Sequence, residues 1–265
     1  MSLEIQKELK EIQELYKSNA RSLTYNALIY GGMGVGKTKL LETCRKPVLV
    51  FSFDPGGTIT IRDDIAKGEI IADTRYEEED PKAPTAAELW DREYSRLKRA
   101  GVFKNIGTLA IDSGTTWASA IMNLTLKKAG RTGGVPQQND YLPTMVVMEN
   151  AIKDMCSLPC DFLFLCHEDT DKDEASGKMF IGPLLIGKLK YRIPILFDEV
   201  YCAMSKETSA GVNYHLLTRS TGLYKARTRL GRGNLFEMYE EQNIKKLLQK
   251  AGYDTSDKQL TPTTT

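Results

Sequence analysis

Eight consecutive residues carry the strongest chemical signal in the sequence. Residues 31–38 read GGMGVGKT, which fits G-x-x-x-x-G-K-[ST] and directly follows the apolar run NALIY. In this pattern backbone N–H groups face phosphate oxygens, the lysine contacts the β- and γ-phosphates, and the last hydroxyl binds Mg²⁺. The alternative is a glycine-rich turn that carries Lys-Thr by coincidence. We expect ATP to bind here, through Gly31, Gly32, Met33, Gly34, Val35, Gly36, Lys37, Thr38 and Lys39.

A magnesium site beside such a loop needs a carboxylate, which normally ends another buried strand. The apolar run GTLAID ends at Asp112, and we predict that Asp112 holds Mg²⁺ together with Thr38. The alternative is an aspartate that caps the following helix. Many motor ATPases place a glutamate next in the chain to polarise the attacking water, but the next residue here is Ser113. The general base is therefore expected elsewhere.

Asp54 is the candidate for that base. It ends the apolar run PVLVFSF, near the tip of an expected neighbouring strand, where a carboxylate can reach water beside the γ-phosphate. The competing interpretation is a turn aspartate before Pro55-Gly56-Gly57.

Composition limits the class of protein. The 265 residues are 41% hydrophobic, and 36 Lys and Arg against 35 Asp and Glu leave a formal net charge of +1. Any binding of a polyanion must therefore come from local patches. The amino-terminal residues have neither the apolar core of a signal peptide nor an apolar span of about 20 residues. We expect a soluble cytoplasmic protein that does not contact a membrane.

Five cysteines, an odd number, lie mostly in apolar segments. This pattern favours reduced thiols that pack in the core. Cys156, Cys160, Cys166 and His167 suggest a zinc site as the alternative, although strand alternation would direct neighbouring side chains to opposite faces.

Hydrophobic patterning predicts an α/β fold with three parts. An amphipathic helix occupies residues 1–20, an ATPase domain residues 21–252, and a disordered tail residues 253–265. The domain contains compact apolar runs separated by helix-length stretches, which indicate a mainly parallel sheet flanked by helices. Those runs are NALIY, PVLVFSF, GTLAID, DFLFLC and DEVYCAM.

Two other kinds of segment complete the expected domain. VNYHLLTRS and GLYKARTR flank Thr221-Gly222, which predicts a hairpin of antiparallel strands at the carboxyl-terminal edge of the sheet. Residues 74–88, 130–143 and 167–183 are rich in glycine, proline and charge, and we predict that they are irregular.

The order of these features resembles the RecA-like ATPase core. That fold has a P-loop strand, a strand ending in the catalytic carboxylate, a strand ending in Asp-Ser, a strand ending in a polar sensor, and then antiparallel strands. This chain presents residues 31–38, Asp54, Asp112-Ser113 and His167 in that order. With its late segment LFDEV, it is similar to the phage P-loop ATPase family that contains the minimal RecA-like single-strand annealing recombinases, the fourth Sak class. The resemblance covers about residues 25–236.

The resemblance implies roles for two site residues. His167 would sense the γ-phosphate and link it to the loop that follows, whereas a strand-end histidine bonded to a neighbour is the structural alternative. RecA-like recombinases usually have glutamate at the base position, and Asp54 is one methylene shorter. That departure puts efficient hydrolysis in doubt, but not nucleotide binding.

The resemblance also places DNA contacts in two loops, one after the Asp-Ser strand and its helix and one after the sensor strand. By position, these are residues 130–143 and the stretch after His167. They supply side chains that contact phosphates or stack on bases. Ordinary solvated loops explain the same composition. The candidates are Arg131, Gln137, Tyr141, Lys188, Lys190 and Arg192.

The run YKARTRLGRG holds four cationic side chains and no carboxylate. In related hexameric helicases and recombinases a K-x-R pair reaches the γ-phosphate of the neighbouring subunit, and the resemblance assigns that role to Lys225 and Arg227. In a strand these two and Arg229 would form one cationic row. The alternative is an exposed edge strand that uses cations to block aggregation.

Together these features predict a magnesium-dependent, DNA-stimulated ATP hydrolase. It would bind single-stranded DNA and promote annealing or strand exchange as a homo-oligomeric ring or filament, with a single-strand binding protein as a further partner. A phage-encoded member would act in the host cytoplasm. One alternative is a nucleotide-switched accessory ATPase, such as a helicase loader or packaging-related protein, that acts on a protein partner. Another is a structural DNA-binding oligomer that uses ATP only at its interfaces.

Overall fold

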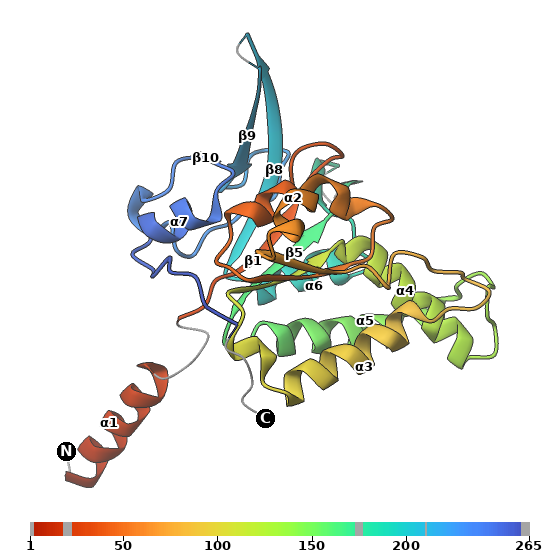
Figure 1. The fold of residues 1–265 in the computed structure, drawn as a ribbon, viewed down its shortest axis with the longest axis horizontal. Coiled ribbons are helices and arrows are strands. Elements are labelled where there is room, and N and C mark those ends of the chain that lie inside the picture. Colours follow the sequence, from red (N-terminus) through yellow and green to blue (C-terminus); the bar gives the residue numbers. More distant parts are fainter. Residues whose placement is uncertain (1–2, 18–22, 173–176, 210, 261–265) are drawn as a thin grey trace.

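The computed structural model describes residues 3–17, 23–172, 177–209 and 211–260 (Figure 1). The α-helices are α1 (Leu3–Lys17), α2 (Arg62–Ala66), α3 (Ala86–Arg99), α4 (Gly114–Lys128), α5 (Gln138–Met155), α6 (Leu189–Leu196) and α7 (Ile244–Lys250). The 3₁₀ helices are η2 (Lys39–Thr43), η3 (Gly57–Ile61), η4 (Val102–Lys104) and η5 (Arg232–Asn234). The strands are β1 (Asn26–Tyr30), β2 (Val48–Ser52), β3 (Ile70–Asp73), β4 (Thr108–Asp112), β5 (Asp161–Cys166), β6 (Glu168–Lys172), β7 (Met179–Pro183), β8 (Glu199–Thr208), β9 (Gly211–Leu217) and β10 (Tyr239–Glu241).

Eight of these strands form one sheet in the order β10-β9-β8-β1-β5-β4-β2-β3. The strands from β8 to β3 run parallel, and β9 and β10 add antiparallel partners at one edge. The predicted fold class, a mainly parallel sheet with antiparallel edge strands, is confirmed. Strand β5 lies between β1 and β4, and therefore the carboxyl ends of β1, β5, β4 and β2 lie next to one another along one edge.

Helices cover both faces of the sheet, which explains why its strands read as continuous apolar runs. Alternate β1 residues enter two separate cores. Leu28 and Tyr30 join the core beneath α3, α4, α5 and α6, whereas Ala27 and Ile29 join the core beneath η2 and α7. Figure 1 shows α3, α4 and α5 together on one side of the sheet and α2 and α7 on the other. The helices packed on the two faces hold the strands in position, and with them the edge of the sheet that carries the candidate site.

Gly114 allows α4 to start directly behind that edge. A Cβ atom at this position would lie 2.0 Å from Cζ of Phe164, a buried ring on β5. Any side chain here would have to displace the core. Ser113 caps the helix, because its side chain accepts a hydrogen bond from the N–H of Thr116. Helix α4 therefore begins at Gly114, two residues after Asp112, and its first turn lies beside the strand ends.

The predicted hairpin around Thr221-Gly222 is wrong. Strand β9 pairs with β8 instead, with Thr208 opposite Gly211. Residues 223–230 form no regular strand, and only isolated bridges join Tyr224 to Ile181 and Arg227 to Val200. The apolar end of β8 is a better partner for the β9 core residues than the cationic run, because Leu216 and Leu217 are fully buried.

Other sequence expectations need correction. Residues 167–183, expected to be irregular, contain the antiparallel pair β6–β7. Helix α5 starts at Gln138 through a capping box, so that only the first part of residues 130–143 is a loop. The helix expected after the P-loop is the five-residue 3₁₀ helix η2. Strand β3 was not predicted.

The two ends of the chain differ from the body. The α1 side chains from Glu4 to Leu15 are exposed, and the predicted amphipathic helix is present. Residues 253–260, expected to be disordered, contact the body: the N–H of Lys46 donates to Asp257 at 2.6 Å, and the N–H of Lys258 donates to the carbonyl of Lys46 at 2.8 Å. Residues 261–265 lie outside the described part.

All five cysteines are buried and none is joined in a disulfide, as the packing interpretation predicted. Among the described residues, no group of three or more His, Cys, Asp or Glu side chains is placed to hold a metal ion. No helix in that part of the chain is long and apolar enough to cross a membrane.

A buried ion pair at the start of β5 anchors the sheet. The Asp161 carboxylate accepts hydrogen bonds from the N–H of Tyr25 at 2.8 Å and from Nε of Arg45 at 2.7 Å, and its side chain is fully buried. Asp161→Ala leaves the guanidinium without its partner, and we expect a loss of about 3–5 kcal/mol in the free energy of unfolding. Asp63→Ala, at an exposed pair with Arg62, should change it by less than about 0.5 kcal/mol. Urea denaturation measures both, and equal effects would contradict an anchoring role.

Candidate nucleotide site

The P-loop connects the end of β1 to η2, as its sequence predicts. Gly34 and Gly36 have positive φ angles of 74° and 87°, which other residues rarely adopt. A Cβ atom at Gly31 would lie 2.5 Å from the backbone oxygen of Ala203. In the part of the chain that the structure describes, the backbone N–H groups of residues 33–38 donate no hydrogen bond. The loop is thus a cradle of free donors, which fits a phosphate chain.

Lys37 lies within this cradle. Its Nζ donates to the carbonyl oxygens of Gly31 at 2.8 Å and Gly32 at 2.7 Å, and the residue is 8% exposed. Burial lowers the pKa of Lys37, although the nearby Asp112 carboxylate opposes that effect. Lys37 forms no salt bridge with any residue that the structure describes. A buried cation held only by carbonyl dipoles is suited to an incoming anion.

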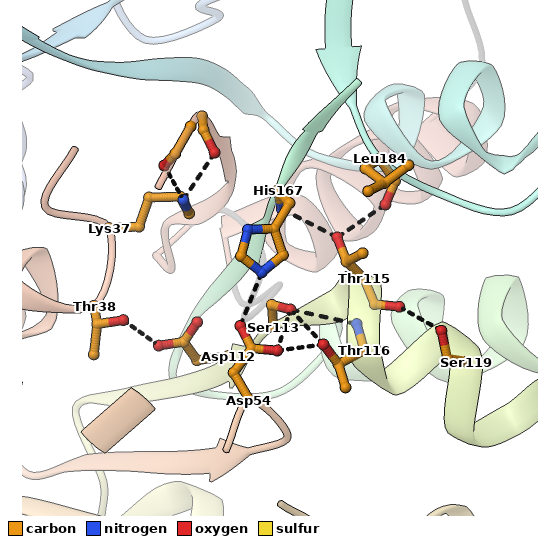
Figure 2. A network of polar contacts seen from close by, with 12 residues as sticks. Lys37, Thr38, Asp54, Asp112, Ser113, Thr115, Thr116, Ser119, His167 and Leu184 are labelled. Carbon is orange, nitrogen blue, oxygen red and sulfur yellow. Dashed lines mark hydrogen bonds and ion pairs between the residues drawn. The ribbon is translucent and has the colours of Figure 1, made fainter. Parts of the chain in front are cut away.

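Thr38 and Asp112 meet, as predicted for magnesium ligands. The Thr38 hydroxyl donates to Oδ2 of Asp112 at 2.6 Å (Figure 2). Burial raises the pKa of Asp112 to about 6, and the charge of Asp54 adds to this increase. A hydroxyl and a carboxylate are oxygen ligands of the kind Mg²⁺ prefers, and a cation would stabilise the ionised carboxylate. These two residues therefore fit the metal.

Asp54 lies at the centre of a polar network. Its Oδ1 accepts hydrogen bonds from the hydroxyls of Ser113, at 2.8 Å, and Thr116, while its Oδ2 lies 3.0 Å from Nε2 of His167 (Figure 2). Burial raises the pKa of Asp54, but the three hydrogen bonds outweigh burial and the net pKa is lowered. Asp54 is therefore ionised at neutral pH and only accepts hydrogen bonds, so that Nε2 of His167 carries the shared proton.

This contact joins two residues that the sequence analysis treated separately. An ionised carboxylate that fixes one imidazole nitrogen as a donor leaves Nδ1 as an acceptor in the neutral ring. Two catalytic arrangements are compatible with the pair: Asp54 accepts a proton from water itself, or it orients His167 to do so. The predicted role of Asp54 as base and that of His167 as sensor both remain predictions.

His167 also connects the site to the β6–β7 pair. Its backbone N–H donates to Oγ1 of Thr115 at 3.0 Å, and that hydroxyl donates to the carbonyl of Leu184 at 2.9 Å. The N–H of Leu184 in turn donates to the carbonyl of His167 at 2.8 Å. The first turn of α4 and the end of β7 are therefore fastened to the same histidine.

The structure does not form the expected cationic row. The guanidinium of Arg227 donates to the carbonyls of Pro194 at 2.8 Å and Phe197 at 2.6 Å, at the end of α6. Arg229 pairs with Asp198 at 2.8 Å. Lys225 is exposed, and its Nζ lies 4.9 Å from the ring centroid of Phe180 on β7. Because residues 223–230 are not a strand, these side chains do not share one face.

Three of the predicted DNA-binding cations lie in ion pairs within the chain. Arg131 pairs with Asp140, Lys190 with Asp171, and Arg192 with Glu149 at 2.6 Å. The other three candidates differ. Gln137 caps α5, Tyr141 is 37% exposed on the first turn of that helix, and Lys188 is exposed just before α6.

Several residues at the site escaped the sequence analysis. Ser113 and Thr116 bind Asp54 because α4 starts at the strand end, and a serine followed three residues later by a hydroxyl was the available signal. Glu77 receives hydrogen bonds from the hydroxyl of Ser52 at 2.7 Å and the N–H of Gly56 at 3.0 Å, and so shapes the turn after β2. Gln242 donates to the carbonyl of Val35 at 2.8 Å, a contact over a long sequence separation that no pattern indicated.

Comparison with known families agrees with this geometry. The model of the AAA domain family matches residues 24–230, which include the P-loop, Asp54, Asp112 and His167. The chain belongs to the AAA domain family. This AAA domain protein is thus a P-loop ATPase, a class that binds nucleotide and usually Mg²⁺.

Solved structures and curated proteins add little to that assignment. The AAA domain protein is similar to the crystal structure of a KaiC-like protein from the hyperthermophilic archaeon Pyrococcus horikoshii OT3, with 14% sequence identity and a TM-score of 0.40. The alignment covers 74% of this chain and 79% of that chain. No curated protein matches the sequence significantly.

The Asp54–His167 contact gives a prediction for the AAA domain protein. Asp54→Asn keeps the shape of the side chain but removes its charge, and the amide cannot accept at both positions. We expect the turnover number for ATP to fall about 100-fold or more while the dissociation constant for ATP changes less than about threefold. Phosphate release and calorimetry measure the two quantities. Asp63→Asn, at an exposed carboxylate on α2, serves as the control, and wild-type turnover by Asp54→Asn would exclude a catalytic role.

Proposed function

We propose that this P-loop ATPase is a RecA-like recombination ATPase, which binds single-stranded DNA and promotes annealing or strand exchange as a homo-oligomer. The observation that carries the proposal is the contact between His167 and Asp54, since it links the proposed base to the residue that directly precedes β6. In the recombinases that the sequence resembles, the corresponding segment binds DNA. ATP and Mg²⁺ are the proposed ligands of the P-loop, Thr38 and Asp112.

Hydrogen bonds extend from the P-loop strand to the same segment. The Tyr30 hydroxyl, at the end of β1, donates toward the carbonyls of Ile181 at 3.0 Å and Lys225 at 2.7 Å. The N–H of Lys225 donates to the carbonyl of Ile181 at 3.1 Å. A change at the phosphates would thus reach β7 through both His167 and Tyr30. Lys225, being exposed, is the proposed contact to the γ-phosphate of a neighbouring subunit.

Two of the predicted DNA-binding segments meet in space. A Cβ atom at Gly187 would lie 3.8 Å from the ring of Tyr141, so that Tyr141 on α5 is next to the residue that precedes Lys188. An aromatic ring beside an exposed lysine is the combination that single-stranded DNA sites use for a base and a phosphate. We propose Tyr141 and Lys188 as the DNA contact, with a single-strand binding protein as a further partner.

Three of the predicted DNA-binding cations already form ion pairs within the chain, and this favours a second candidate function. Arg131, Lys190 and Arg192 each have a carboxylate partner, which weakens their attraction for DNA phosphates. A nucleotide-switched accessory ATPase, such as a helicase loader or packaging-related protein, needs no such attraction. Its switch would be the same His167 contact, acting on a protein partner through β6–β7.

Single-stranded DNA should raise the ATP turnover number of the wild-type protein. Lys188→Ala should weaken DNA binding and reduce the slope of log affinity against log salt by about one, because one phosphate contact is lost. Lys104→Ala is the matched control, since this exposed lysine precedes β4 at the opposite edge of the sheet. Turnover with and without DNA, and fluorescence anisotropy at several salt concentrations, give these quantities. No DNA binding and no stimulation would reject the recombination proposal and favour the accessory ATPase.

A further inference from the structure

A cavity of about 520 Å³ opens beside the second half of the P-loop. One wall consists of the loop and η2, and the other of β9, Glu241 at the end of β10 and Gln242. Strand β9 belongs to the β8–β9 hairpin, which Figure 1 shows projecting beyond the sheet. Its volume is within the usual range for small-molecule sites. The lining side chains include Lys39, Thr43, Val212, Tyr214 and Gln242, and Gly36 contributes backbone.

Tyr214 and His215 are the aromatic residues that line this cavity, and Tyr214 is the one next to the P-loop. It is 40% exposed, and a Cβ atom at Gly36 would lie 3.0 Å from its ring. Among the hydrogen bonds of the described residues, none involves the Tyr214 hydroxyl. Gln242 holds the two walls together, because its amide donates to the carbonyls of Val35 at 2.8 Å and His215 at 3.2 Å. The ring is therefore held at the loop with part of its surface open.

We propose that this cavity holds the nucleoside end of the bound nucleotide, with the base stacked on Tyr214. The inference rests on the proposed phosphate site. In that site Lys37 contacts the β- and γ-phosphates, so that the α-phosphate and the nucleoside leave the loop on the side of Thr38 and Lys39. The cavity includes both Gly36 and Lys39, and it begins where the phosphate chain would end.

Charge distinguishes this cavity from the one on the other side of the loop. That second cavity, of about 710 Å³, is lined by Gly32, by Lys206 and by the carboxylates of Glu168, Glu240 and Glu241, of which Glu240 is paired with Lys250 at 2.6 Å. In the first cavity Glu42 is paired with Lys39 at 3.2 Å, and Glu241, which borders both, is paired with Lys246. The first cavity therefore has fewer carboxylates in its lining than the second, and both are paired with lysines. It should repel the phosphates of a nucleotide less.

Stacking on tyrosine predicts affinity without strong base preference, because every base has a flat π-face. Tyr214→Leu should raise the dissociation constants of both ATP and GTP about tenfold. The dissociation constant of inorganic tripolyphosphate, which has no nucleoside, should stay within about twofold. Tyr214→Phe should bind ATP as the wild type does. Tyr239→Leu is the control, because this half-exposed tyrosine on β10 lines only the second of the two cavities.

Isothermal titration calorimetry in the presence of Mg²⁺ measures these constants, with circular dichroism to confirm folding. Equal losses for ATP and tripolyphosphate in Tyr214→Leu would overturn the inference, since the ring would then act by supporting the loop. No loss for either ligand would overturn it as well. Lys37→Ala tests the proposed function separately: it should weaken ATP and tripolyphosphate together, and unchanged binding there would reject the phosphate site itself.

Photolabelling of the wild-type protein gives a second test that does not depend on a variant. With 2-azido-ATP, whose reactive group is on the base, we expect covalent label in the peptide that contains residues 212–215, and competition by unlabelled ATP. Competed label confined to other peptides would overturn the inference.

Discussion

The parallel alignment of β1, β5, β4 and β2 is the constraint on which the site depends. Because these strands run in one direction, the loop after β1, Asp54 after β2, Asp112 at the end of β4 and His167 after β5 all reach the same edge of the sheet. Apolar side chains on both faces hold that alignment, and their burial is the main favourable term. The relative positions of the site residues are thus a consequence of how the core packs.

The two carboxylates at this edge have pKa values that are shifted in opposite directions. Asp112 is almost fully buried, which raises its pKa to about 6 and leaves it in need of a cation. Asp54 accepts hydrogen bonds from Ser113, Thr116 and His167, which keep its pKa low despite burial. Similar groups in different surroundings therefore suit different roles, and we propose Asp112 as the metal ligand and Asp54 as the group that accepts or directs the proton of water.

The features that short stretches of sequence encode could be predicted. The P-loop, the buried strands and the Thr38–Asp112 contact could be predicted, because each depends on a motif or on a continuous apolar run. Features that depend on which distant segments pair with each other could not be predicted. The β8–β9 pairing replaced the hairpin expected at Thr221-Gly222. Arg227 donates to a carbonyl just after α6 and Arg229 pairs with Asp198, instead of the two forming a cationic row. Side-chain partners such as Asp140 for Arg131 and Glu149 for Arg192 depend on helix packing that a linear pattern does not specify.

We propose that the P-loop, Asp112 and the Asp54–His167 pair together hydrolyse a nucleotide. Phosphate release from ATP by the wild-type protein, compared between Mg²⁺ and excess EDTA and with Lys37→Ala, tests it most directly. We expect steady release with Mg²⁺, and background release both in EDTA and from the variant. Release that persists in Lys37→Ala, or a folded wild-type protein that releases no phosphate with Mg²⁺ in the presence or absence of DNA, would contradict it.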